Sequence, residues 1–161
     1  MNVFYCDHSP AEAARSLADR HVVKMAVESA QLAWTVASLL GLPVNDGYRP
    51  THAAHPCTRR MVDDLGYRGW ALAHGLALCD EYRHRYGREH GSEAPLRLAI
   101  ERLGGLASIT VDPAVVPQAM PEEHKVDRDP VTAYRRCLRA KYAAWGGAAR
   151  WTRREVPAWM R

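Results

Sequence analysis

The stretch of sequence that decides the fold is HVVKMAVESAQLAWTVASLL, residues 21–40. On a helical wheel with 100° per residue, its polar side chains fall within an arc of about 80°. These side chains are His21, Lys24, Glu28, Gln31 and Thr35. Nearly all other positions are apolar, and a helix that is apolar around most of its circumference is buried in a core. The stretch therefore predicts one long central helix in an all-α fold.

The narrow polar stripe on this helix has two interpretations. It could face a thin strip of solvent, with Lys24 and Glu28 forming a surface ion pair four residues apart. Alternatively, it could form the wall of an active-site cleft, since charged side chains are rarely buried unless they are paired. We favour the cleft, because an imidazole, an amine, a carboxylate and a carboxamide in one row are groups that perform chemistry.

Helix-capping signals set the limits of the expected helices. Ser9 is a preferred N-cap, Pro10 suits the first helical position, and Gly41 follows the end of the first helix. Asp129 and Pro130 repeat the start signal later in the chain. The expected helices cover residues 10–40, 56–88, 94–103 and 130–145, and residues 2–6 could form a short strand.

The second expected helix, residues 56–88, has a wider polar face, which indicates contact with solvent. Its members are Asp63, Tyr67, Trp70, His74, Glu81, Arg85 and Arg88. Residues 110–126, TVDPAVVPQAMPEEHKV, form an irregular segment with three prolines. Such a segment is longer than ordinary connections, and we expect it to lie across the cleft as a lid or wall. The whole chain, residues 1–161, is predicted to be one helical domain.

Composition excludes several classes of protein. With 161 residues, 47% hydrophobic and 25% charged, the chain has the balance of a globular domain and not of a disordered one. It contains no apolar run long enough for a membrane span and no secretory signal pattern, so we expect a cytoplasmic protein without a membrane partner. The four scattered cysteines indicate reduced thiols and neither a zinc site nor a disulfide framework.

The charged residues suit an anionic partner, for which nucleic acid or a nucleotide is the expected candidate. The excess of arginine over lysine is also what a GC-rich genome produces. The net charge is +4, and the 22 basic residues include only three lysines. Basic residues are concentrated after residue 128. Within the last helix we expect Arg135, Arg136 and Arg139 to bind phosphate groups.

The loop after the first helix offers a metal site as an alternative. It contains His52 and His55 in the sequence THAAHP, residues 51–56. Imidazole and carboxylate groups are common metal ligands, so a metal-dependent hydrolase or oxygenase would need at least three such groups to converge. The candidates are Asp7, His8, His21, Glu28, His52 and His55.

The whole chain resembles an uncharacterised family found in phage and bacterial genomes. The resemblance is carried by five short elements: Asp19–Met25 (DRHVVKM), Glu28–Leu32 (ESAQL), Thr51–Pro56 (THAAHP), Gln118–Pro121 (QAMP) and Ala133–Arg135 (AYR). This likeness by itself implies no particular chemistry.

The first helix also resembles that of the phage pyrimidine-dimer DNA glycosylases, the endonuclease V family. Leu17-Ala18-Asp19 followed by His21 is similar to the start of the family's helix, and Glu28 falls where the family keeps its catalytic glutamate. The resemblance implies a glycosylase/lyase that attacks with an amine. The family uses an N-terminal threonine, whereas this chain has Asn2, and Val27 and Gln31 replace arginines that flank the family's glutamate.

These observations predict an enzyme that acts on a nucleic-acid base or nucleotide. The expected catalytic residues are Glu28 as acid/base, Lys24 as an amine made nucleophilic by burial, and His21. Met1 supplies the alternative amine. The expected substrate-binding residues are Gln31, His52, His55, Arg135, Arg136 and Arg139, with no metal ligand assigned and the cofactor left open. A non-catalytic helical module that binds nucleic acid is the second alternative, after the metal-dependent enzyme.

Overall fold

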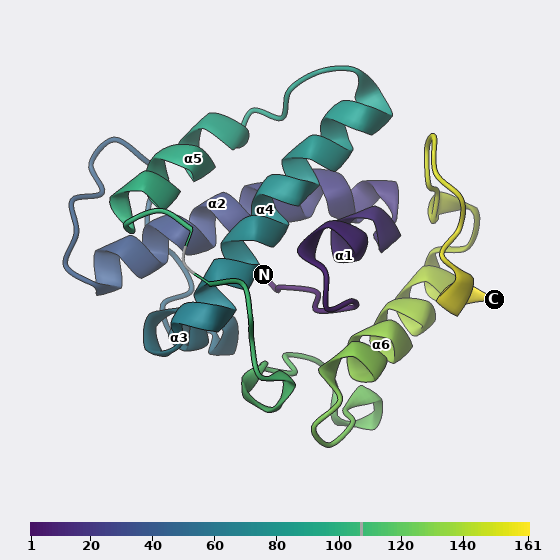
Figure 1. Cartoon of the computed structure of the whole chain (residues 1–161). Helices are drawn as coiled ribbons and strands as arrows, with labels where there is room; N and C mark the ends of the chain where they lie inside the picture. The colour runs from purple at the N-terminus through teal and green to yellow at the C-terminus, as the bar shows by residue number, and fades with distance from the viewer. Residues whose placement is uncertain (107) are drawn as a thin grey trace.

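The computed structural model describes residues 1–106 and 108–161, and all the regular structure in them is helical (Figure 1). The expected all-α class is confirmed. The α-helices are α1 (Pro10–Ser16), α2 (Asp19–Leu39), α3 (Pro56–Asp63), α4 (Leu65–Tyr86), α5 (Glu93–Arg102) and α6 (Pro130–Trp145). Residues 2–6 have no regular structure, and the Cys6 amide donates to the Phe4 carbonyl at 2.9 Å, so the possible strand there is wrong.

Helices α2 and α4 form the centre of the molecule, with α1 and α5 packed against them. Their close approach depends on Gly75 of α4. A Cβ atom at this position would lie 2.8 Å from the Cβ atom of Ser29 on α2 and 2.9 Å from a methyl carbon of Leu96 on α5. The absence of a side chain at residue 75 therefore lets three helices meet.

The expected single helix over residues 10–40 is wrong, because the chain breaks between α1 and α2. Leu17 and Ala18 are fully buried and extended, with ψ angles of 143° and 155°. The C-terminal part of the chain binds the main chain at this break: the Tyr142 hydroxyl accepts from the Ala18 amide at 3.1 Å, and the Asp19 amide donates to the Arg150 carbonyl at 2.8 Å. These long-range partners compensate for the helical hydrogen bonds that the break gives up.

The expected helix over residues 56–88 is also two helices, α3 and α4. Asp64 lies between them with φ −131° and ψ 114°, and its carboxylate accepts from the Tyr67 amide at 2.7 Å. Asp64 is therefore the N-cap of α4, although the apolar period over residues 56–88 is compatible with one continuous helix. Gly87, with φ 69°, ends α4 in the left-handed conformation that glycine adopts without strain.

The wider polar face expected to contact solvent is instead buried over most of α4. Trp70, His74, Glu81 and Arg85 are each no more than 3% exposed. Glu81 pairs with Arg85 at 2.6 Å and with Arg154 of the C-terminal tail at 2.9 Å. The charged groups Glu81 and Arg85 on this face thus bind other parts of the chain rather than water.

The last two helices lie where the sequence placed them, within one residue at each end. The Asp129 carboxylate caps α6 by accepting from the Thr132 amide at 3.0 Å. After α6 the tail folds back onto α1, where the Trp151 ring nitrogen donates to the Ser16 carbonyl at 3.1 Å. All four cysteines are free, and three of them are buried. None of the described helices combines the length and apolar character needed to cross a membrane.

Candidate active site at the N-terminal segment

The polar stripe of α2 is covered by the first residues of the chain, which run between the helices (Figure 1). Glu28 and His21 are buried, with 7% and 4% of their surfaces exposed. The Asn2 amide donates to Glu28 Oε2 at 3.0 Å, and the Phe4 ring lies 4.6 Å from the His21 ring. At these positions the stripe therefore faces another part of the protein and not a strip of solvent.

Two primary amines contact the Glu28 carboxylate on different oxygens. The α-amine of Met1 lies 3.5 Å from Oε2, and the Lys24 Nζ atom lies 3.2 Å from Oε1. The Met1 side chain is only 2% exposed although the residue as a whole is half-buried, so the accessible part of Met1 is its main chain. The Lys24 side chain is 68% exposed, and the burial expected for this amine is therefore wrong.

His55 lies within electrostatic reach of this group. Burial lowers the pKa of His55, and the charges of the N-terminal amine and His52 lower it further, while Glu28 and the Met1 backbone act in the opposite direction. Its Nδ1 atom accepts from the Cys57 amide at 3.2 Å and caps α3. The ring is therefore neutral near pH 7, with its Nδ1 atom engaged in the cap of α3.

The loop that carries His55 is held by Thr35, the last polar residue of the stripe. The Thr35 hydroxyl donates to the Thr51 carbonyl at 3.0 Å and accepts from the Thr51 amide at 3.0 Å. His52 is exposed, with a φ of 55°, and its Nδ1 atom lies 2.8 Å from the Thr51 hydroxyl. Gln31 is half-buried one turn from Glu28. The structure thus brings His55 toward Glu28 and leaves His52 facing solvent.

His21 has a packing role in this arrangement. Its Nδ1 atom lies 2.8 Å from the Tyr142 hydroxyl, and the ring packs between Phe4 and Trp145, with ring centres 4.6 and 4.8 Å away. Burial lowers the pKa of His21 to about 3, and the charges of Lys141 and Lys24 act in the same direction. The ring is thus neutral, and its contacts with Phe4 place it directly beneath the N-terminal segment.

Sequence reasoning missed Asn2, whose side chain fixes the segment against Glu28. Its Nδ2 atom donates to the Ala119 carbonyl at 2.9 Å, and its Oδ1 atom accepts from the Tyr134 hydroxyl at 3.1 Å. The Cys57 thiol points at the same Oδ1 atom from 3.8 Å. We call the surroundings of the Asn2 side chain the Asn2 recess. Its partners Ala119 and Tyr134 belong to the short elements 118–121 and 133–135, but a single sequence does not show that these elements meet.

The three arginines expected to bind phosphate differ in their surroundings. Arg135 pairs with Asp7 at 3.0 Å and donates to the Cys6 carbonyl at 2.8 Å, so it holds the N-terminal segment. Arg139 donates to the Trp159 carbonyl. Arg136 is exposed. Two of the three guanidinium groups are thus bound within the chain, and Arg136 is left as the accessible one.

The residues named for a metal alternative are not assembled into a site. No group of three or more His, Cys, Asp or Glu side chains in residues 1–106 and 108–161 is arranged to hold a metal ion. Asp7 is bound to Arg135, and His8 lies 3.3 Å from the Tyr5 hydroxyl. Nothing in this geometry supports the metal-dependent alternative.

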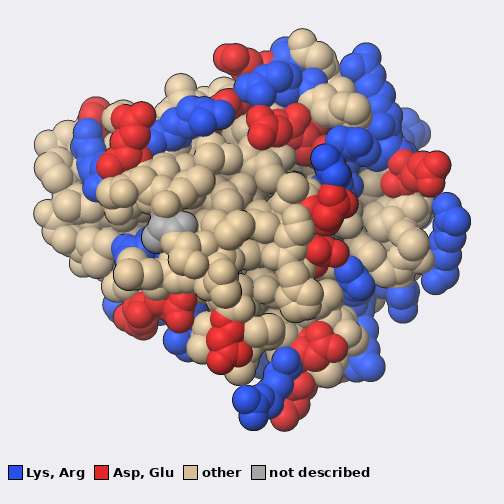
Figure 2. All heavy atoms as spheres, in the orientation of Figure 1, with Lys and Arg blue, Asp and Glu red and all other residues tan. Residues whose placement is uncertain are grey.

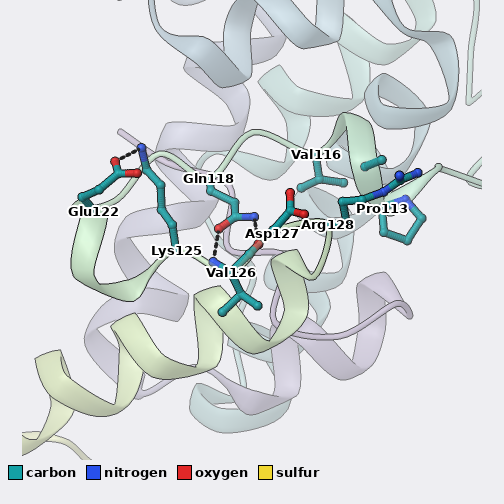
Figure 3. A pocket seen from close by; sticks show the side chains of 9 residues that line it. Pro113, Val116, Gln118, Glu122, Lys125, Val126, Asp127 and Arg128 are labelled. Atoms are coloured by element: carbon teal, nitrogen blue, oxygen red, sulfur yellow. Dashed lines mark hydrogen bonds and ion pairs between the residues drawn. The ribbon is translucent and has the colours of Figure 1, made fainter.

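The proline-rich segment 110–126 lines two cavities. One cavity, of about 510 Å³, is enclosed largely by the segment itself and the residues that follow it (Figure 3). There the Gln118 side chain accepts from the Val126 amide, and Lys125 pairs with Glu122 (Figure 3). A second cavity lies between this segment, the N-terminal residues and α6. The segment therefore borders the N-terminal site but does not cover Glu28 as a lid.

Charge on the molecular surface is mixed. On the face shown in Figure 2, positive and negative side chains alternate along the rim, and much of the centre bears neither. This face has no continuous basic surface that could bind a long polyanion by charge alone.

Comparison of the chain with protein-family models, curated proteins and solved structures found no match. The arrangement of its own residues is therefore the basis for assigning a function.

Proposed function

We propose that this protein is an enzyme that acts on a nucleic-acid base or nucleotide by glycosylase/lyase-like chemistry. The observation that carries the proposal is the buried Glu28 carboxylate with a primary amine on each oxygen, Met1 at 3.5 Å and Lys24 at 3.2 Å. Such chemistry needs an amine nucleophile beside a group that can accept and return a proton. The likeness of the first helix to endonuclease V agrees with this reaction class.

In the proposed reaction an unprotonated amine attacks C1′ of the target nucleotide. A C1′–N bond forms as the bond to the base breaks, and the base leaves with the bonding electron pair and is protonated by water. Glu28 takes a proton from the attacking nitrogen and returns it to the ring oxygen O4′ as the C1′–O4′ bond opens. The product is a protonated Schiff base, and its hydrolysis releases the sugar aldehyde and restores the amine.

The nucleophile is one of the two amines on Glu28. The Asn2 main-chain nitrogen lies 3.0 Å from Glu28, closer than that of Met1. An α-amine would thus face the carboxylate whether Met1 is retained or removed. In unperturbed peptides an α-amine has a pKa of about 7.7–8.0 and a lysine amine about 10.4, so chemistry favours the α-amine.

Borohydride trapping tests the proposal. The wild-type protein is incubated with duplexes that contain an abasic site, uracil or ultraviolet-induced pyrimidine dimers, in the presence of borohydride. We expect a covalent protein–DNA product with at least one of these substrates, and a loss of about 100-fold or more in trapping rate in Glu28→Gln. Glu101→Gln, an exposed carboxylate on α5, is the matched control. Absence of trapping with all three duplexes overturns the proposal.

A further inference from the structure

A cavity of about 480 Å³ adjoins the Glu28 site on the other side of Asn2. Its volume is within the range of pockets that bind small molecules. One wall is apolar and includes Phe4, Met120 and Trp145, and the cavity also contains Lys141 and His124. An apolar wall with a few polar groups suits a ligand in which a planar ring is attached to a charged group.

The aromatic wall is held in place from behind. The buried His21 ring lies between Phe4 and Trp145, and it is fixed in turn by the Tyr142 hydroxyl at 2.8 Å. The Phe4 ring also meets Tyr134 edge-on, with ring centres 6.1 Å apart. The two aromatic side chains are therefore ordered before any ligand arrives, which reduces the entropy lost on binding.

The cavity carries positive charge at its edge. The Lys141 Nζ atom lies 5.9 Å from the centre of the Phe4 ring, and the Arg20 guanidinium lies 5.7 Å from that of Trp145. Lys141 is exposed and has no carboxylate within 4.0 Å in the part of the chain that the structure describes. An accessible ammonium group at the edge of an aromatic wall is complementary to a phosphate attached to a planar base.

We propose that this cavity binds a nucleotide, with the base on the half-buried Met120 and Trp145 side chains and the phosphate at Lys141. Phe4, which is only 4% exposed, supports this wall from beneath. Asn2 joins the cavity to the candidate active site, because its amide nitrogen contacts Glu28 while the residue also lines the cavity. The link to chemistry at Glu28 rests on the proposed function, whereas the binding itself does not. The ligand is either a free mononucleotide or a nucleotide at the end of a strand.

Calorimetric titration at low salt tests the binding. The probes are the four deoxynucleoside monophosphates, thymidine and inorganic phosphate. We expect at least one monophosphate to bind more tightly than thymidine or phosphate. Ala144→Phe fills the cavity from an exposed position on α6 and should weaken binding about tenfold or more, the order of one lost base-stacking contact. Ala143→Phe, also exposed on α6 but outside the cavity, should bind normally.

Charge at the cavity is tested separately. Lys141→Gln should weaken monophosphate binding about fivefold and leave thymidine binding unchanged. Lys125→Gln is the control, because the Lys125 ammonium group is paired with Glu122 in the wild type. A 5′-phosphorylated oligonucleotide that displaces the monophosphate assigns the site to strand ends, and failure to displace it assigns the site to free nucleotides.

Two results would overturn the proposal. One is the absence of binding of all four monophosphates at millimolar concentration, and the other is equal binding by Ala144→Phe and Ala143→Phe. Glu28→Gln separates this proposal from the proposed function, because it should bind monophosphates like the wild type while losing borohydride trapping. Trapping without monophosphate binding would retain the proposed function and refute the nucleotide pocket.

Discussion

Asn2 is bound to Glu28 through its main chain, with its amide nitrogen 3.0 Å from the carboxylate. Its side chain is held at the same time by the Ala119 carbonyl and the Tyr134 hydroxyl. Asn2 therefore fixes the start of the N-terminal segment over α2 through contacts with three parts of the chain, while Arg135 holds the segment further along. This relationship supports both the candidate active site and its boundary with the neighbouring cavity.

Asn2→Ala should lower the free energy of unfolding by about 1–3 kcal/mol, because the Ala119 carbonyl loses its partner and Tyr134 loses one of two. Urea denaturation measures the change. Asn45→Ala, at an exposed position, should change stability by less than about 0.5 kcal/mol. Equal stability of the two variants would show that the Asn2 recess does not hold the segment.

Gly75→Ala should destabilise the protein by about 1–3 kcal/mol despite the higher helix propensity of alanine. The added Cβ atom would lie 2.8 Å from that of Ser29, so α2 and α4 would have to separate. Gly91→Ala, where the new Cβ atom meets nothing within 4 Å, is the control for thermal unfolding. A Gly75→Ala protein as stable as the wild type would contradict the tight crossing.

Glu81→Gln should lower stability at pH 7 by about 1–3 kcal/mol, because the fully buried Arg85 loses the charge of one carboxylate partner and keeps the other, Asp19 at 2.8 Å. Burial raises the pKa of Glu81, but hydrogen bonds from Arg154 and Arg85 outweigh it, and the net shift is downward. This carboxylate therefore contributes stability above its unfolded pKa of about 4.3, which is lost as the pH falls through the folded value. The variant should show a smaller difference in stability between pH 7 and pH 3 than the wild type. An unchanged difference would refute the role of the ion pairs.

His21→Gln should reduce the loss of stability between about pH 6.5 and pH 3. The folded pKa of His21 is lowered to about 3, so the unfolded chain binds a proton in this interval that the folded protein does not. Folding is therefore penalised progressively as the pH falls below about 6.5. Urea unfolding over pH 4–7 measures the slope, with the exposed His84→Gln as the control. Identical slopes in His21→Gln and the wild type would show that His21 is accessible and charged.

The sequence was informative where local signals decide structure. The cap at Asp129 and Pro130 is local and predicted α6 correctly. The apolar period over residues 21–40 is also local and predicted the helical body of α2, although not its start at Asp19. The breaks at Ala18 and Asp64 were missed for different reasons. Ala18 is held by Tyr142, far away in the chain, whereas Asp64 is a local cap hidden in a sequence that also suits a continuous helix.

The candidate site was predictable only in part. The spacing of Lys24 and Glu28 gives a contact within one helix, and the structure has it. The contacts of Glu28 with Met1 and Asn2 join residues more than twenty positions apart, and no periodic pattern encodes them. The same holds for Arg135, whose use by Asp7 rather than by a phosphate depends on tertiary folding.

Mass-spectrometric mapping of the borohydride-trapped adduct is the most direct test of the central claim, that an amine on Glu28 is the nucleophile. After digestion, we expect the reduced sugar on the N-terminal α-amine or on Lys24, the two amines that contact Glu28. Lys24→Ala and an N-terminally acetylated protein then show which amine reacts, since only one of them should abolish the adduct. An adduct on Lys125 or Lys141, or trapping that survives in the acetylated Lys24→Ala protein, would contradict the account.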